Sequence, residues 1–224
     1  MRENFTEIVF ILDRSGSMAG LEADTIGGYN SMLQKQKQEE GKAVISTVLF
    51  DDKVEILHDR EGLEQVKPIT KEEYYVRGCT ALLDAVGGAI QHIKQVQKSV
   101  PKEERPGKTL FIITTDGMEN ASKRYTYDKL KKMVEKQQKK HQWEFIFLGA
   151  NMDAIEVAGR FGIQASRAVN YECDSVGTKL NYEVMSKVVS CARSCVSAEA
   201  MARAFESDEM LGQIQEDYRK RHKA

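Results

Sequence analysis

The sequence has few cysteines and prolines, no overall excess of one charge sign and no internal repeat. Its 224 residues include four cysteines and three prolines, and 33 basic side chains nearly balance 34 acidic ones, for a formal net charge of -1. The cysteines form no C-x-x-C pair, so reduced thiols are the simplest interpretation. The even charge balance gives no reason to expect nucleic acid or an anionic membrane as a partner.

Targeting and membrane signals are also missing from the sequence. The first four residues lead directly into a strand pattern without a cleavable apolar leader, and no apolar run approaches the length that spans a bilayer. With no export signal, we expect a cytoplasmic protein. Two nucleotide-binding motifs, G-x-x-x-x-G-K-[ST] and G-x-G-x-x-G, do not occur either, which argues against a nucleotide-binding function.

What the sequence does contain is a regular alternation of strand and helix patterns. Most strand candidates are short apolar runs, and one alternates in period two as an edge strand does. They occupy residues 7–12, 43–50, 53–58, 109–114, 143–148 and 165–169. Helical spacing fills most of the segments between them. The sequence therefore predicts an α/β, three-layer, doubly wound (Rossmann-like) fold, with a mostly parallel six-stranded sheet, one antiparallel edge strand and helices on both faces.

The length fits one α/β domain with a short helical appendage. Residues 1–196 contain every strand candidate, and the pieces 197–205 and 207–222 both show helical patterns. We therefore expect an α/β domain over residues 1–196 and a C-terminal helical extension over residues 197–224. Cys191 and Cys195 continue the apolar stripe of the helix before the extension, which makes core thiols the better interpretation of these two residues.

The first strand ends in a D-x-S-x-S loop, Asp13-Arg14-Ser15-Gly16-Ser17. In open α/β sheets, ligands bind at the carboxyl ends of strands. One carboxylate and two hydroxyls are hard oxygen donors, which suit a divalent cation that also keeps water or an outside ligand. Taken alone, the pattern fits equally a Ser/Gly turn whose aspartate caps the next helix.

Two further segments place oxygen donors where they could reach that loop. Thr80 precedes a strong helix pattern that begins at Leu82, and Asp116 follows the fourth strand within Thr115-Asp116-Gly117. Each has an ordinary alternative role, Thr80 as a helix N-cap and Asp116 as part of an Asp-Gly turn. In the doubly wound strand order 3-2-1-4-5-6, the first and fourth strands are neighbours, so these loops can converge on one crevice.

This combination resembles the von Willebrand factor type A (vWA) domain and its metal-ion-dependent adhesion site (MIDAS). The resemblance covers roughly the first 195 residues, and Cys79 stands where small residues such as glycine are frequent. It implies Mg²⁺, with Mn²⁺ or Ca²⁺ possible, completed by a glutamate or aspartate of a protein partner. The metal ligands that it implies are Asp13, Ser15, Ser17, Thr80 and Asp116.

The expected function is therefore a non-enzymatic, metal-dependent protein-interaction module, without a nucleic-acid or membrane partner. Two alternatives stay open: a metal-dependent phosphoester hydrolase, and a scaffold subunit whose metal is purely structural. The hydrolase is disfavoured because Ser15 replaces the second acid of the D-x-D pair, and no His or Lys lies within the motif loops to act as a base.

Several other residues near these loops receive weaker assignments. Asp51 and Asp52 are expected to be turn residues, and His58 a surface histidine. Aromatic, methionine and arginine side chains are enriched at interfaces. The candidates for the rim of the site are Arg14, Met18, Tyr74, Tyr75, Arg77, Met118 and Glu119.

Overall fold

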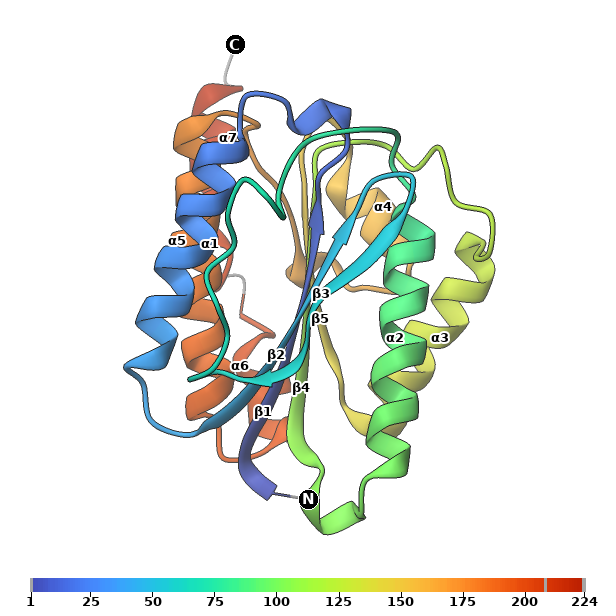
Figure 1. Ribbon diagram of the computed structural model, residues 1–224, viewed down its shortest axis with the longest axis vertical. Helices are drawn as coiled ribbons and strands as arrows, with labels where there is room; N and C mark the ends of the chain where they lie inside the picture. Colours follow the sequence, from blue (N-terminus) through green and yellow to red (C-terminus); the bar gives the residue numbers. More distant parts are fainter. Residues whose placement is uncertain (1, 208, 223–224) are drawn as a thin grey trace.

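The computed structural model describes residues 2–207 and 209–222. Six strands form one sheet in the order β3-β2-β1-β4-β5-β6, and every neighbouring pair is parallel except β2 and β3 (Figure 1). The strands are β1 Arg2–Asp13, β2 Lys42–Phe50, β3 Val54–Gly62, β4 Pro106–Thr115, β5 Glu144–Gly149 and β6 Ala168–Asn170. The predicted strand order and the single antiparallel edge strand are confirmed.

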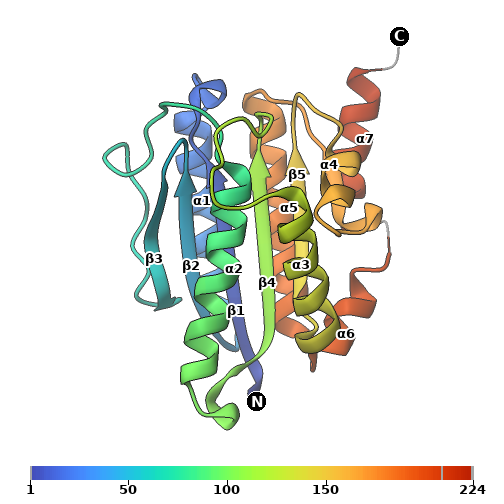
Figure 2. The ribbon, with the colours of Figure 1, turned by 90° about the vertical axis from the view of Figure 1, so that its right-hand side faces the viewer.

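Helices cover both faces of this sheet and make a three-layer molecule (Figures 1 and 2). One face carries α1 Glu22–Lys37, α5 Ser175–Ser194, α6 Ala198–Ala204 and α7 Gly212–Arg221. The other face carries α2 Leu82–Ser99, α3 Tyr127–His141 and α4 Ala154–Arg160. Short 3-10 turns lie at Gly16–Met18, Lys102–Glu104 and Ala165–Arg167.

Two hydrophobic cores lie on opposite sides of the sheet because successive side chains of a strand point to opposite faces. On β1, Ile8, Phe10 and Leu12 belong to the core under α1 and α5, whereas Val9 and Ile11 belong to the core under α2 and α3. Burial on both faces explains why the parallel strands are continuously apolar in the sequence.

Helices α6 and α7 pack on the first of these cores. Met201, Phe205, Leu211 and Ile214 are buried within the same cluster as the side chains of α1 and α5. The last helix begins at Gly212, later than the predicted piece over residues 207–222, and Asp208 lies outside the described residues. Among the described helices, none combines the length and apolar character needed to cross a membrane.

His58 departs from its predicted position on the surface. Its side chain on β3 is buried, and its Nδ1 lies 2.9 Å from the hydroxyl oxygen of Thr47 on β2. The reason is the loop after β3, where Val66 and Ile69 are buried in the α1 and α5 core. The loop therefore covers the strand, a tertiary contact that no local pattern of the sequence indicates.

Candidate metal centre

The carboxyl ends of β1 and β4 lie side by side at the upper edge of the sheet in Figure 1. Leu12 of β1 is level with Thr114 of β4, so Asp13 and Asp116 follow neighbouring strands. The strand order places the loops after β1 and β4 at the crevice where open α/β sheets bind ligands.

The segment before α2 joins these two loops through backbone hydrogen bonds. The N–H of Gly16 donates to the carbonyl oxygen of Gly78 at 3.1 Å, and the N–H of Asn120 donates to the carbonyl oxygen of Thr80 at 3.1 Å. Gly78 has a φ of +68°, and a Cβ there would come within 2.4 Å of a carboxylate oxygen of Asp52. Glycine is therefore required directly before Cys79, and the backbone fixes Thr80 beside the first loop.

The five side chains that the sequence predicts as ligands form one connected cluster. The Thr80 hydroxyl donates to Ser15 Oγ at 3.1 Å, Ser15 Oγ lies 3.1 Å from Ser17 Oγ, and the Ser17 hydroxyl donates to Asp116 Oδ1 at 2.5 Å. Asp13 joins the cluster by accepting the backbone N–H of Ser15 at 2.7 Å. The structure thus brings together donors that are separated by up to a hundred positions in the chain.

Both carboxylates are buried and held by further side chains. Asp13 and Asp116 each expose only 2% of their surface. Asp13 Oδ2 accepts a hydrogen bond from the Thr115 hydroxyl at 2.5 Å, and Asp116 Oδ2 accepts one from the Cys173 thiol at 3.3 Å. Burial raises the pKa of Asp13 to about 6, although the bonds from Thr115 and Ser15 lower it, and burial also raises the pKa of Asp116. A cation nearby would favour the charged form of both carboxyl groups.

The ordinary alternative for Thr80 does not hold, because other residues satisfy the start of α2. The Glu119 carboxylate accepts the N–H of Leu83 at 2.8 Å, and the Ser122 hydroxyl accepts the N–H of Asp84 at 3.0 Å. The helix begins after Ala81, and the Thr80 hydroxyl points to Ser15 instead. The side chain of Thr80 is therefore not an N-cap.

Gly117 faces the three hydroxyls of the cluster. A Cβ at this position would lie 2.8 Å from Thr80 Oγ1, 3.0 Å from Ser17 Oγ and 3.6 Å from Ser15 Oγ. The absence of a side chain keeps free a space that these hydroxyl oxygens border. Among the residues that the structure describes, no group of three or more His, Cys, Asp or Glu side chains could hold a metal ion. A cation at this edge would therefore depend on the hydroxyls as well as the two carboxylates.

Comparison with known proteins was informative at the level of structure alone. No model of a known protein family matches the chain, and no curated protein matches it. Among solved structures, a domain described as von Willebrand factor type A from Catenulispora acidiphila superposes with a TM-score of 0.54, over 88% of this chain and 42% of that one, at 12% identity. The chain has the vWA fold.

Two other solved structures superpose on this chain at similarly low identity. The D319A mutant of the PilB minor pilin from Streptococcus sanguinis matches with a TM-score of 0.57 and 11% identity, over 83% of this chain and 61% of that one. Proximal thread matrix protein 1 from the mussel byssus, in a structure with a zinc-occupied MIDAS motif, matches with a TM-score of 0.55 and 14% identity. The match covers 83% of this chain and 46% of that one. The chain spans about half the length of these proteins, so the likeness establishes the fold alone.

Three of the residues predicted for the rim of the site are buried. Arg14 lies inside the molecule, where its guanidinium pairs with Asp51 at 2.9 Å and Glu55 at 2.7 Å, and donates to the carbonyl oxygen of Glu73 at 3.0 Å. Arg14 therefore links the first loop of this vWA fold to the β2–β3 hairpin and to the segment before α2. The prediction of a rim position was wrong because these contacts join residues 37 to 59 positions apart.

Met18 and Tyr74 are the other two rim candidates that are buried. The Tyr74 hydroxyl donates to the carbonyl oxygen of Asp13, so this ring supports the start of the D-x-S-x-S loop. Glu119 is half-buried and serves the start of α2, as described above. Tyr74 and Glu119 thus stabilise the loops and do not form the rim.

Tyr75, Arg77 and Met118 do lie on the surface beside the site. Met118 is 65% exposed, and the Arg77 guanidinium lies 5.0 Å from the centre of the Tyr75 ring. Arg77 also pairs with Asp51 at 2.8 Å. Asp51 is thus a turn residue, as predicted, since it accepts the N–H of Lys53, but it is also the buried anion between two arginines.

Sequence reasoning missed two side chains that contact the carboxylates, Thr115 and Cys173. Thr115 belongs to the T-D-G triplet, so the sequence placed it next to Asp116. Its hydrogen bond to Asp13 could not be predicted from the sequence. Cys173 follows β6, and nothing in the local sequence indicates that its thiol reaches back to Asp116.

Proposed function

We propose that this chain is a metal-dependent protein-binding module. Mg²⁺, with Mn²⁺ or Ca²⁺ as alternatives, would be held by Asp13, Ser15, Ser17, Thr80 and Asp116, and would bind a glutamate or aspartate side chain of a protein partner. The observation that carries the proposal is the connected cluster of hard oxygen donors, whose three hydroxyls lie around the bare Cα of Gly117. Hard oxygen donors suit these cations, and Mg²⁺ commonly keeps part of its shell for outside ligands.

The charges of the five proposed ligands favour an additional acidic ligand from outside. Asp13 and Asp116 supply two negative charges, and the hydroxyls of Ser15, Ser17 and Thr80 are neutral. A divalent cation there would keep enough positive character to attract a further carboxylate. Support for a metal in this fold comes from the byssus protein, whose MIDAS motif is described as zinc-occupied. The exposed Tyr75 and Met118 and the half-buried Arg77 at the rim offer side chains of the types that partners contact.

We propose a binding role in preference to hydrolysis for a chemical reason. The further side chains that hold the two carboxylates are Thr115 and Cys173. Burial and the neighbouring Asp116 charge raise the pKa of the Cys173 thiol to about 12, so it is a poor base at neutral pH. These contacts thus add no base to the two carboxylates, which are themselves proposed as metal ligands. We further propose a cytoplasmic location, which rests on the sequence expectation.

Asp13→Ala tests the metal site directly. We expect the affinity for Mg²⁺ or Mn²⁺, measured by titration calorimetry, to fall by about 100-fold or more, because loss of a ligand should exceed the usual effect of losing an outer hydrogen-bond partner. Asp59→Ala removes an exposed carboxylate of β3 and is the matched control, with circular dichroism to verify folding. Unchanged metal affinity in Asp13→Ala would refute the assignment.

Partner capture distinguishes a metal that takes part in partner binding from one that only stabilises the fold. The protein is used as bait in cell extract with Mg²⁺ and again with chelator, alongside Asp13→Ala. We expect a partner that is retained only with Mg²⁺ and only by the unsubstituted chain. A partner that is retained equally with chelator would show that the metal, if present, merely stabilises the scaffold.

A further inference from the structure

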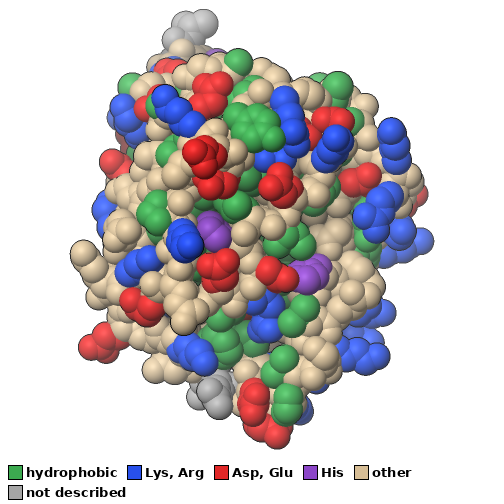
Figure 3. Space-filling model, viewed as in Figure 1, with side chains coloured by type: hydrophobic (Ala, Val, Ile, Leu, Met, Phe, Trp, Pro, Cys, Tyr) green, Lys and Arg blue, Asp and Glu red, His purple; other side chains and the backbone are tan. Residues whose placement is uncertain are grey.

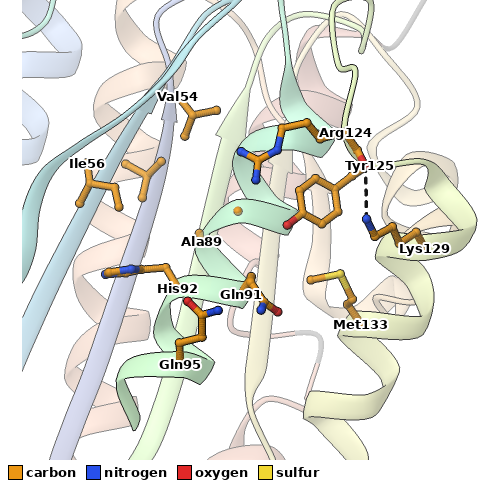
Figure 4. Close-up of a pocket in the computed structure, with 12 residues that line it drawn as sticks. Val54, Ile56, Ala89, Gln91, His92, Gln95, Arg124, Tyr125, Lys129 and Met133 are labelled. Atoms are coloured by element: carbon orange, nitrogen blue, oxygen red, sulfur yellow. Dashed lines mark hydrogen bonds between the residues drawn. The ribbon is translucent and has the colours of Figure 1, made fainter. Parts of the chain in front are cut away.

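A groove lies beside the edge strand β3, on the face of the sheet that carries α2 and α3. Its volume is about 740 Å³, and its walls are formed by the β2–β3 hairpin, the middle of α2 and the start of α3 (Figure 4). It is separate from the candidate metal centre, because none of the five proposed ligands lines it.

The side of this groove formed by β3 is apolar and open to solvent. Val54 and Ile56 are 40% and 42% exposed, and both point into the groove, with Met133 of α3 on the opposite side (Figure 4). Because side chains alternate along β3, the intervening Glu55 turns away and pairs with Arg14. Neighbouring exposed apolar side chains in a hollow are a feature of binding surfaces.

The upper end of the groove is positively charged. Arg124 and Lys129 stand on either side of the Tyr125 ring, and the Lys129 ammonium lies 3.3 Å from the carbonyl oxygen of Arg124 (Figure 4). Neither cation forms an ion pair within the described part of the chain. Lys129 lies in the first turn of α3, where the helix dipole disfavours a cation. Stabilisation of the helix therefore does not explain its charge.

The same seam between α2 and α3 continues downward as two further hollows of about 260 and 400 Å³. Lys94, Lys132 and Lys136 line the first of them, and more lysines line the second. Among the described residues that line the groove and both hollows, none is Asp or Glu. In the view of Figure 3, Lys and Arg side chains gather along the right-hand side, over α2 and α3. A nearly neutral protein thus carries an acid-free stripe along one helix pair.

We propose that this α2–α3 groove binds an acidic amphipathic segment of a partner protein. The apolar side chains of that segment would cover Val54, Ile56 and Met133. Its carboxylates would face Arg124 and Lys129 in the groove and Lys132 in the adjoining hollow. Charge complementarity of this kind sets specificity and accelerates association. Single-stranded nucleic acid fits the groove less well, because its binding depends on aromatic rings available for stacking. Among the described residues that line the groove, Tyr125 is the one Phe, Tyr or Trp, and it is only 9% exposed.

A designed peptide tests the proposal without knowledge of the natural partner. The probe is a fluorescein-labelled helical peptide with leucines at i, i+3, i+4 and i+7 and glutamates on the flanking positions. Matched probes replace every glutamate by lysine, or replace the peptide by a labelled oligothymidine of similar length. We expect the acidic peptide alone to bind, measured by fluorescence anisotropy at low salt, with weaker binding as salt is added.

Charge reversal on α3 locates the binding surface. Lys132→Glu should weaken acidic-peptide binding by about ten-fold or more, because it places like charges together. Lys139→Glu makes the same change at an exposed position of α3 that lines neither the groove nor the two hollows, and it should have little effect. Ile56→Ser should also weaken binding, since it removes an apolar contact. Circular dichroism checks that each variant is folded.

Several outcomes would overturn the proposal. They are failure of the acidic peptide to bind, equal binding by the lysine peptide, equal losses in the Lys132 and Lys139 variants, unchanged binding in Ile56→Ser, and preference for the oligothymidine. Binding that survives chelator and Asp13→Ala is expected, because the groove does not contain the metal ligands. Loss of binding under those conditions would assign the peptide to the metal centre and would also overturn the proposal.

Discussion

The two helical faces of the sheet use their positive charges differently. On the α1 and α5 face, the buried Arg193 donates to the carbonyl oxygens of Glu39, Glu40 and Gly41 beyond the end of α1. The buried Lys108 donates to the carbonyl oxygen of Arg193 at 2.7 Å and also to that of Cys195. On the α2 and α3 face, Lys94, Lys132 and Lys136 are without ion pairs among the described residues and lie beside solvent. The first set of cations holds the chain together, and the second is left for contacts from outside.

The apolar side chains show the same difference. The α1 and α5 core extends outward to α6 and α7, so that Phe205 and Ile214 are buried. On the other face, Val54 and Ile56 of the edge strand stay open to solvent beside the groove. Substitutions of Phe205 or Ile214 should therefore affect folding, and those of Val54 or Ile56 should affect association.

Phe205→Ala should give the largest change in stability. Its ring, 1% exposed, is part of the α1 and α5 core, and removing a buried phenylalanine typically costs about 3–5 kcal/mol in free energy of unfolding. Ile56→Ala on the other face should change it by about 0.5 kcal/mol or less. Urea denaturation measures both. A cost below about 1 kcal/mol for Phe205→Ala would instead mean that residues 197–224 are a loosely attached extension.

Arg193→Met should have the next largest effect. It keeps much of the side-chain length but leaves several carbonyl oxygens near Gly41 without their donor, at a cost of about 1–3 kcal/mol for a buried unsatisfied group. Lys136→Met makes the same kind of change on the α2 and α3 face, where the lysine is exposed, and should cost little. Equal costs for the two substitutions in urea denaturation would remove the distinction between the faces.

A smaller effect should be visible in the titration of His141, at the end of α3. Burial lowers its pKa below 6.5, and the nearby charges of Lys140, Arg105 and Lys94 lower it further. Because the folded pKa lies below the unfolded one, the unfolded chain takes up a proton first, and this group reduces stability as the pH falls through 6.5. No such loss from His141 is expected above that pH.

Nuclear magnetic resonance can follow this histidine directly. Lys94→Gln and added salt should each raise its titration midpoint, since each weakens the repulsion from neighbouring cations. Lys131→Gln, at a lysine that pairs with Glu135, is the control and should leave the midpoint in place. If neither salt nor Lys94→Gln changes the titration midpoint of His141, the result would contradict an excess of positive charge on this face.

The parts of the structure that could be predicted are those encoded by short local patterns. The strands are nearly continuous apolar runs, and the doubly wound order then places Asp13 beside Asp116. Contacts between distant segments could not be predicted, because nothing in the residues next to Arg14 or His58 indicates what covers them. The hydrogen bond from the Cys173 thiol to Asp116 could not be predicted either, because the two residues are 57 positions apart in the sequence. The packing of α6 and α7 could not be predicted for the same reason. Their amphipathic patterns show that each buries one side, but the patterns do not show which part of the molecule covers that side.

The contacts of Arg14 have a consequence for recognition at the upper edge. Its guanidinium holds the D-x-S-x-S loop, the β2–β3 hairpin and the carbonyl of Glu73 in one fixed arrangement. Such a platform is preorganised, so a visitor that docks there gives up little conformational entropy of the host. The proposed capture of an acidic side chain at this edge would then require no folding of this protein upon contact.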